Sequence, residues 1–504
     1  MLPLYEGLRA LGAPEASRDL AAAARRSGDS RWAYRCLLTH AYGYDPVRAR
    51  RVRDEVEGEA PIVWALGLLG SVLPAFLLLL VVRAVAERAS PGTGTAAAVM
   101  LGAGTLVMVF ASQLFGHMLS TLLAFAAFAL LWRERDGRQR LPWVLAAGVL
   151  SGLAVTAEYP LAIAGAIVGC YAISRSGLLA RGGAYSAGVA LGVAPLLLYN
   201  QWAYGDLTHL SYDHAVEQQG FTGHWTLGLN EGGFFGIGLP RPDVALELLV
   251  SSRGLLVLSP VLVAAIAGTW LLGRLGRRAE ARTIGAVALA FLLYDAGYWL
   301  PFGGGTPGPR FLIPILPFLC VGLGLALRRM PAVTLGLAVP SALTMLLATA
   351  TYPLIGNDDV GQWVHRALEA TFVNTPPVAL GVTGWLAVAP LLALVAAAIA
   401  CAALATEGID VRADLAWGVR AVLGWGVIAA VGPAPWGDAA LLGNWAELAL
   451  VLTGVAAGLA TLAVAALRAG IPARRLARPS FVGWRGPAAR TEVVERDPAP
   501  DLAL

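Results

Sequence analysis

The sequence predicts an all-α protein, a polytopic bundle of membrane-spanning helices. Of its 504 residues, 57% are hydrophobic and only 14% are charged, whereas soluble domains carry roughly 25% charged residues. The mean hydropathy is +0.65. The apolar runs are long, and about 20 apolar residues are needed for a helix to cross a bilayer. We therefore expect about 13 transmembrane helices, with surface-lying helices on the outer face.

The expected spans follow one another with short connections. They are the runs 61–82, 96–111, 118–132, 143–157, 159–173, 184–199, 254–273, 283–301, 311–327, 331–352, 377–405, 415–431 and 446–467. Around them the chain divides into four parts. These are an amphipathic and polar surface segment (1–60), a transmembrane core with an outward loop at 200–253 (61–352), an outward loop with C-terminal helices (353–468) and a disordered, Pro- and Arg-rich cytoplasmic tail (469–504).

Arginine placement predicts the orientation. Short Arg-rich loops mark the cytoplasmic side of a membrane protein, and they occupy every second connection here, as in Arg83–Arg88 and Arg133–Arg140. The opposite, outer connections carry the aromatic residues, histidines and glycines, so we expect the functional site there. The Arg-rich segment 1–60 is the exception, because alternation places it outside.

Composition narrows the function further. The chain has no lysine, which indicates a GC-rich bacterial genome, and we expect a multi-pass protein of the bacterial cytoplasmic (inner) membrane. The net charge of +4 gives no reason to expect a nucleic-acid partner. The four cysteines form no CxxC pair, so neither disulfides nor a zinc site is predicted. No cleavable signal peptide is expected, because no apolar stretch precedes residue 61.

The most informative segment is the Gly/Pro-rich hairpin 302–310, which places Arg310 at the mouth of an apolar helix. A guanidinium binds phosphate oxygens through bidentate, charge-assisted hydrogen bonds. The surrounding glycines let backbone amides approach the same oxygens. We interpret Arg310 as the anchor of a lipid phosphate; the alternative is a helix-end arginine that snorkels to the interface. Arg253 enters its own span in the same way, so both arginines are lipid-phosphate candidates.

Three further residues are candidates for catalysis. Asp295 lies inside an apolar run, where an acid indicates function by default. We expect it either to pair with Arg310 or to line a cavity; the alternatives are a structural ion pair and a solvated interfacial acid. Glu158 lies at an outward turn and is either a general base or a residue that caps the next helix. His117, at another outward turn, is either a proton carrier or a polar interfacial residue.

The outward loop 200–253 is rich in aromatic residues, acids and amides. Sugar faces stack on aromatic rings, so Trp202, Tyr204, Asp206 and Tyr212 are candidates for binding the acceptor or the sugar. The alternative is an interfacial loop with girdle aromatics. The sequence contains no metal-binding motif. It identifies no cofactor, and a divalent cation is the one candidate.

At these residues the chain resembles the C-type glycosyltransferase superfamily, and within it the bacterial relatives of the protein O-mannosyltransferases and of the lipid A aminoarabinose transferases. The resemblance covers roughly residues 60–350 and rests on five segments together. They are 114–132, 152–160, 199–206, 252–260 and 308–314.

The resemblance implies inverting transfer of a sugar, on the extracytoplasmic face, from a polyprenyl-phosphate donor to a glycan, lipid or protein acceptor. In the family an acid in the first outward loop, after the first span, acts as general base. We expect that span and its acid to be missing from this sequence, since segment 2–12 resembles the surface helix that follows that loop; either the true start lies upstream of Met1, or the chain is a divergent, inactive member. His117 occupies the place of the family's second acid. A transporter or flippase of a lipid-linked glycan, and an inactive scaffold of envelope assembly, are the alternatives.

Overall fold

The computed structural model describes residues 6–7, 9–12, 65–175, 177–209, 236–351, 360–372, 377, 382–406, 408–436 and 444–468. Within these ranges the secondary structure is helical, apart from one isolated antiparallel bridge between Ile237 and Tyr298. The expected all-α class is therefore confirmed for this part of the chain. Most of 1–60 and all of 469–504 lie outside the described residues, so their expected character stays a prediction.

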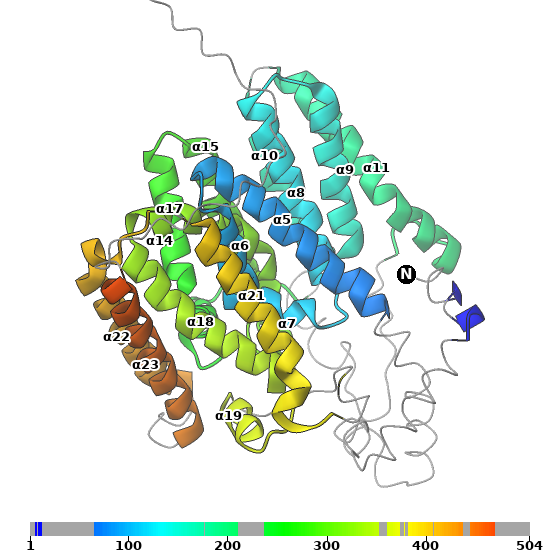
Figure 1. Ribbon diagram of the computed structural model, residues 1–504. Coiled ribbons are helices and arrows are strands. Elements are labelled where there is room, and N and C mark those ends of the chain that lie inside the picture. The colour runs from blue at the N-terminus through cyan, green and yellow to red at the C-terminus, as the bar shows by residue number, and fades with distance from the viewer. Residues whose placement is uncertain are drawn as a thin grey trace, which may run out of the picture.

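The helices follow one another closely along the chain (Figure 1). The first half contains the π-helical turn η2 (Leu68–Val72), α5 (Leu73–Ala89), α6 (Gly94–Gly104), α7 (Leu106–Ala111), α8 (His117–Asp136), α9 (Leu141–Ala157), α10 (Leu161–Ile173), α11 (Leu178–Tyr204), α12 (Pro242–Val250) and α13 (Leu255–Leu258). The second half contains α14 (Val261–Arg274), α15 (Arg278–Ala296), the 3-10 helix η4 (Arg310–Ile315), α16 (Leu316–Cys320), α17 (Gly322–Arg329), α18 (Pro331–Thr351), α19 (Gly361–Leu368), η5 (Gly384–Val388), α21 (Ala389–Ala405), η6 (Val411–Asp414), α22 (Leu415–Val431), η7 (Ala434–Trp436) and α23 (Trp445–Arg468).

Six of the described helices are long and apolar enough to cross a membrane, and the number rises to eight if each of two bent pairs is one span. The count of thirteen is therefore not confirmed. The expected run 96–111 shows one reason, because the chain breaks at Thr105, whose hydroxyl accepts the N–H of Val107 and starts α7. At 1.5 Å per residue, α6 is only about 16 Å long, well short of the roughly 30 Å of bilayer hydrocarbon.

Helices α9 and α11 pack through glycines spaced four residues apart on each helix. A Cβ atom on Gly152 would lie 2.3 Å from the carbonyl oxygen of Val189, and one on Gly192 would lie 2.3 Å from that of Val149. Gly148 and Gly188 are equally close to the facing backbone. Such small-residue faces let membrane helices approach until their backbones touch. This packing fixes the end of α9, where Glu158 lies.

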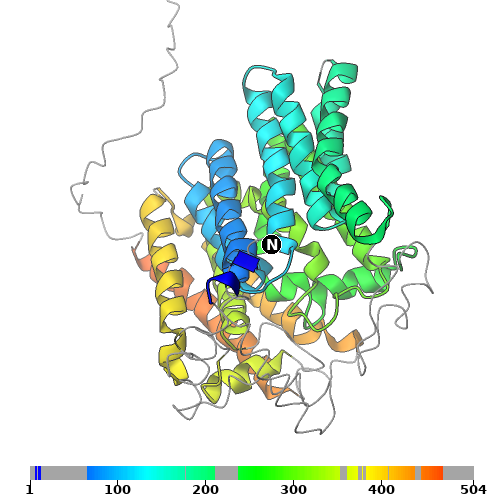
Figure 2. The same ribbon diagram turned by 90° about the vertical axis from the view of Figure 1, so that its right-hand side faces the viewer.

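The Arg-rich loops meet at one end of the bundle, where helices α8 to α11 extend beyond their neighbours (Figures 1 and 2). There Glu134 and Arg181 form a buried two-bond ion pair, with N–O distances of 2.8 and 3.0 Å. The Tyr171 hydroxyl lies 2.8 Å from a Glu280 carboxylate oxygen, and Arg277 pairs with Asp136. The positive-inside rule predicts that this end is cytoplasmic. His117, Glu158 and the 302–310 hairpin are at the opposite helix ends.

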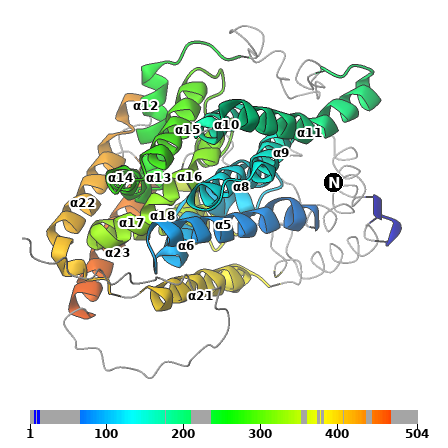
Figure 3. The same cartoon turned by 90° about the horizontal axis from the view of Figure 1, so that it is seen from above.

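The C-terminal helices pack on the flank of the bundle (Figure 3). α18 lies against both α22 and α23, and α21 lies beside α6. The side-chain carboxylate of Asp414 accepts the N–H groups of Ala332 and Val333, which ties the start of α22 to the start of α18. The segments 61–352 and 353–468 thus share one packed interior, and the expected boundary between them stays a prediction.

Candidate functional site

The 302–310 hairpin folds around the side chain of Arg310. Gly303 has a φ of +71°, a conformation that costs little only for glycine. A Cβ atom there would lie 2.2 Å from Nε of Arg310. The guanidinium carbon lies 5.4 Å from the ring centre of Phe115 and 5.1 Å from that of Phe311, at cation–π distances. The hairpin backbone and two rings therefore hold the arginine in one place.

Arg253 acts on the other side of the same hairpin. Its guanidinium donates to the carbonyl oxygens of Gly304, at 2.8 Å, and Thr306, at 2.6 and 3.0 Å. It also lies 4.7 Å from the ring centre of Phe302. The Thr306 hydroxyl is within hydrogen-bond distance of the carbonyls of Phe302 and Gly308. These contacts show Arg253 bracing the turn; a direct bond to phosphate stays a prediction.

Asp295 lies in the last turn of α15 and is fully buried, with 0% exposure. Among the residues that the structure describes, neither carboxylate oxygen has a hydrogen-bond partner. Arg310 is close enough to stabilise its negative charge electrostatically. The expected proximity of these two residues is thus present without a closed ion pair in the described chain.

His117 and Glu158 form a pair at the same end of the bundle. Nδ1 of His117 lies 2.6 Å from a carboxylate oxygen of Glu158, and the Ser120 hydroxyl lies 2.9 Å from the other oxygen. Glu158 is the C-terminal cap of α9, while His117 begins α8. The ends of the two helices therefore hold a histidine–carboxylate pair in which His117 is buried and the Glu158 side chain keeps 20% of its surface exposed. Sequence reasoning missed Ser120, because a serine inside an apolar run gives no signal of its own.

Two phenylalanines connect the His117 pair with Arg310. The rings of Phe115 and His117 stack at 5.5 Å, and Arg310 contacts the same Phe115 ring. Phe311 meets the His117 ring edge-on at 6.3 Å and Tyr298 at 5.3 Å. The structure thus gathers four predicted residues, His117, Glu158, Asp295 and Arg310, around one aromatic cluster.

The predicted sugar-binding residues form a separate group at the tip of α11. Trp202 is 76% and Tyr204 is 47% exposed, and the Tyr204 ring stacks on His209 at 3.9 Å. The N–H and hydroxyl of Thr208 hold the pKa of Asp206 below its usual value. In the described chain, no ring contact joins this tip to His117 or Arg310. Tyr212 lies outside the described residues, and the role of the group stays a prediction.

An apolar cavity of about 320 Å³ lies beside α15. Its walls come from α12 to α16 and η4, and include Leu289 and Leu292 of α15 and Leu312 and Ile315 of η4. Leu289 is 56% exposed, so the cavity opens at the outer surface of the bundle, where acyl chains would be. Asp295 is one turn beyond Leu292, and Arg310 is two residues before Leu312. Neither charged residue lines the cavity, but each lies near a lining residue along the chain.

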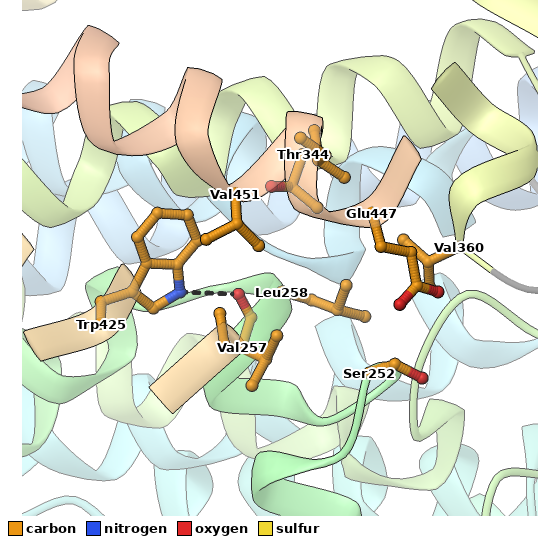
Figure 4. Close-up of a pocket in the computed structure, with 10 residues that line it drawn as sticks. Ser252, Val257, Leu258, Thr344, Val360, Trp425, Glu447 and Val451 are labelled. Atoms are coloured by element: carbon orange, nitrogen blue, oxygen red, sulfur yellow. Dashed lines mark hydrogen bonds between the residues drawn. The ribbon is translucent and has the colours of Figure 1, made fainter. Parts of the chain in front are cut away.

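A second, smaller cavity lies between α13, α18, α22 and α23 (Figure 4). The carboxylate of Glu447 points toward Ser252, and Nε1 of Trp425 donates to the carbonyl of Val257 at 2.9 Å. The cavity volume is about 30 Å³, enough for one water. Glu447 is buried in the first turn of α23. An acid in the run 446–467 was a detectable signal that sequence reasoning did not use.

No metal site is evident in the described part of the chain, where no group of three or more His, Cys, Asp or Glu side chains gathers. The His117 and Glu158 pair supplies only two donors. The divalent cation considered from the sequence stays a prediction.

The fold and site together define a polytopic helical membrane protein with an apolar cavity that opens at the surface of the bundle and an arginine two residues from its wall in the sequence. No protein-family model and no curated protein sequence matches this chain. A structural comparison finds the crystal structure of ArnT from Cupriavidus metallidurans bound to undecaprenyl phosphate, with 14% identity and a TM-score of 0.41. The match covers 79% of this chain and 63% of ArnT, so the chain spans less than two thirds of that protein.

Proposed function

We propose that this protein binds a polyprenyl-phosphate sugar and transfers the sugar on the extracytoplasmic face of the membrane. The observation that supports the proposal is the position of Arg310, two residues before Leu312 in the wall of the apolar cavity. The cavity would accept isoprenoid units, and the guanidinium would pair with the phosphate. Each charge-assisted hydrogen bond to phosphate contributes about 1.5–3 kcal/mol, and apolar burial supplies the remaining affinity.

The pair of His117 and Glu158 suits a base in this reaction. The acceptor O–H would give its proton to Glu158, while its oxygen forms a bond to the anomeric carbon. The bond from that carbon to the phosphate oxygen breaks, and its electron pair leaves with the phosphate held at Arg310. His117 and Ser120 would orient the carboxylate, as partners of a general base do. The exposed tip of α11, with Trp202 and Tyr204, would meet an acceptor arriving from the aqueous side.

Binding of a simple lipid phosphodiester tests the lipid site. Dodecyl methyl phosphate carries one negative charge, as the donor phosphate does, and would be titrated into the full chain in lipid nanodiscs. Replacing Arg310 with Gln removes about 1.5–3 kcal/mol and weakens binding roughly 10- to 150-fold. Arg241→Gln is the matched control, because Arg241 is an exposed arginine at the same end, and it should bind as the wild type does. Equal affinities for all three proteins would reject the site.

Product analysis tests the reaction class. With a polyprenyl-phosphate sugar as donor, a transferase produces a new glycosidic linkage and free polyprenyl phosphate. A flippase changes only the side of the membrane on which the lipid is found, and a scaffold produces neither change. Formation of the linkage by the wild type, and its loss in Glu158→Gln with lipid binding intact, is the expected outcome. Lipid translocation without a new linkage would contradict it.

A further inference from the structure

Asp295 differs from the other buried acids of the described chain whose contacts are known. Glu134 receives two hydrogen bonds from Arg181, and Glu280 receives one from the Tyr171 hydroxyl. Asp295 is more deeply buried than either, yet neither of its oxygens has a hydrogen-bond partner among the described residues. An ionised carboxylate in that position is costly, since burial removes its hydration and no hydrogen bond from the described residues replaces it. The side chain therefore has a strong reason to hold a proton.

The charges around Asp295 make its protonation depend on Arg310. On η4, Arg310 is the cation that favours the ionised carboxylate, while Tyr298 beyond the helix end is neutral when protonated. The other elements packed on α15 add one more cation near this end, the exposed Arg241, which precedes α12 and whose backbone N–H donates to the carbonyl oxygen of Ala296; solvent screens its charge. Their ionisable groups are Asp243 and Glu247 on α12, Cys320 on α16, and, toward the Arg-rich end, Arg274 on α14 and Cys170 and Tyr171 on α10.

A phosphate bound to Arg310 would remove this support. The guanidinium charge would be neutralised by the phosphate, and a second anion would be added near the carboxylate. A nearby like charge disfavours ionisation. The two groups then titrate as a pair, so that filling one site changes the proton on the other.

We infer that the lipid-phosphate site binds its anion together with one proton, and that Asp295 is the residue that carries this proton. The inference rests on the proposed function, because it requires a phosphate at Arg310. In this role Asp295 tunes the affinity of the site for its lipid and is not the base of the transfer reaction. It gives the site a pH dependence that an arginine alone would lack.

Proton counting tests the inference directly. Dodecyl methyl phosphate does not titrate between pH 6 and 9, so any pH dependence belongs to the protein. Calorimetric titration in two buffers of different ionisation enthalpy gives the protons taken up per ligand. In the wild type the uptake should approach about one proton at its maximum, with affinity falling up to about tenfold per pH unit above that point. Asp295→Asn should bind the probe with uptake near zero and a flat pH profile.

Two further variants separate the possible results. Asp243→Asn, which removes an exposed acid on α12, should keep the wild-type proton uptake, because the proton is assigned to Asp295. Arg310→Gln should lose affinity at every pH. Proton uptake that persists in Asp295→Asn, or a wild-type affinity that does not change between pH 6 and 9, would overturn the inference while the lipid site stands. Absence of probe binding, or binding unaffected in Arg310→Gln, would instead overturn the proposed function. Elution volume and melting temperature confirm that Asp295→Asn folds.

Discussion

Gly303 offers a sharp test of how the hairpin holds Arg310, because Gly304 next to it is a matched control. Both glycines have positive φ, +71° and +97°. A Cβ atom on Gly303 would lie 2.2 Å from Nε of Arg310 and 2.8 Å from its Cγ. A Cβ atom on Gly304 would meet nothing within 4 Å. Alanine at either position thus strains the backbone, but only alanine at 303 displaces the arginine.

The two variants should therefore be similar in stability and different in binding. Left-handed backbone costs a non-glycine residue about 1–2 kcal/mol, so both proteins should melt a few degrees below the wild type. Arg310 is a flexible side chain and can move aside at little cost in folding. Its displacement removes a charge-assisted hydrogen bond of about 1.5–3 kcal/mol. Gly303→Ala should bind dodecyl methyl phosphate roughly 10- to 150-fold more weakly than Gly304→Ala.

The assay is the nanodisc titration used for Arg310, together with thermal melting of the same samples. Equal loss of affinity in the two alanine variants would refute the reasoning, since it would show that backbone strain, and not the position of the guanidinium, controls binding. Wild-type affinity in Gly303→Ala would refute it as well.

Two other regions give predictions that do not depend on the site. Gly152→Ala brings a Cβ atom to 2.3 Å from the carbonyl oxygen of Val189 and should lower the free energy of unfolding by about 1–3 kcal/mol. Gly165→Ala is the control, because its Cβ atom would make an ordinary contact at 3.6 Å, and this variant should melt at or above the wild-type temperature. Equal melting temperatures for the two variants would contradict the α9–α11 packing. Glu134 lies just beyond the apolar run 118–132. Burial alone would raise its pKa, but the hydrogen bonds and the charge of Arg181 outweigh burial and hold the pKa below its ordinary value of 4.5. The stability from this pair should be complete above pH 4.5 and fall as the pH drops through the lowered value, so melting temperatures from pH 6 to 3 should decline less in Glu134→Gln than in the wild type.

Much of the site was predictable because its chemistry is local. The Gly- and Pro-rich segment around Arg310 marked a turn that places a charge at a helix mouth, and the structure has that turn. The apolar runs around His117 and Glu158 set these residues at helix ends opposite the Arg-rich loops, and alternating helices brought those ends together. The same alternation predicted the gathering of the Arg-rich loops.

Other features depended on contacts between distant segments. Arg253 resembled Arg310 in sequence, yet its guanidinium is occupied by the carbonyl oxygens of Gly304 and Thr306, which no local pattern indicates. Composition alone also could not give the number of membrane-spanning helices, because Thr105 divides one apolar run into two short helices. The glycine pairs of α9 and α11 were visible in the sequence, but only the packing shows that they face each other.

Photolabelling tests most directly whether a lipid-linked anion occupies this site. A farnesyl phosphate with a diazirine at the end of its chain would be added to the protein in nanodiscs, illuminated, and the labelled peptides identified by mass spectrometry. Our account predicts labelling of the cavity walls on α14 to α16, around Ile266, Leu289 and Leu319, and its loss in Arg310→Gln. Labelling confined to exposed helix faces such as Leu394 of α21, and unchanged in that variant, would contradict it.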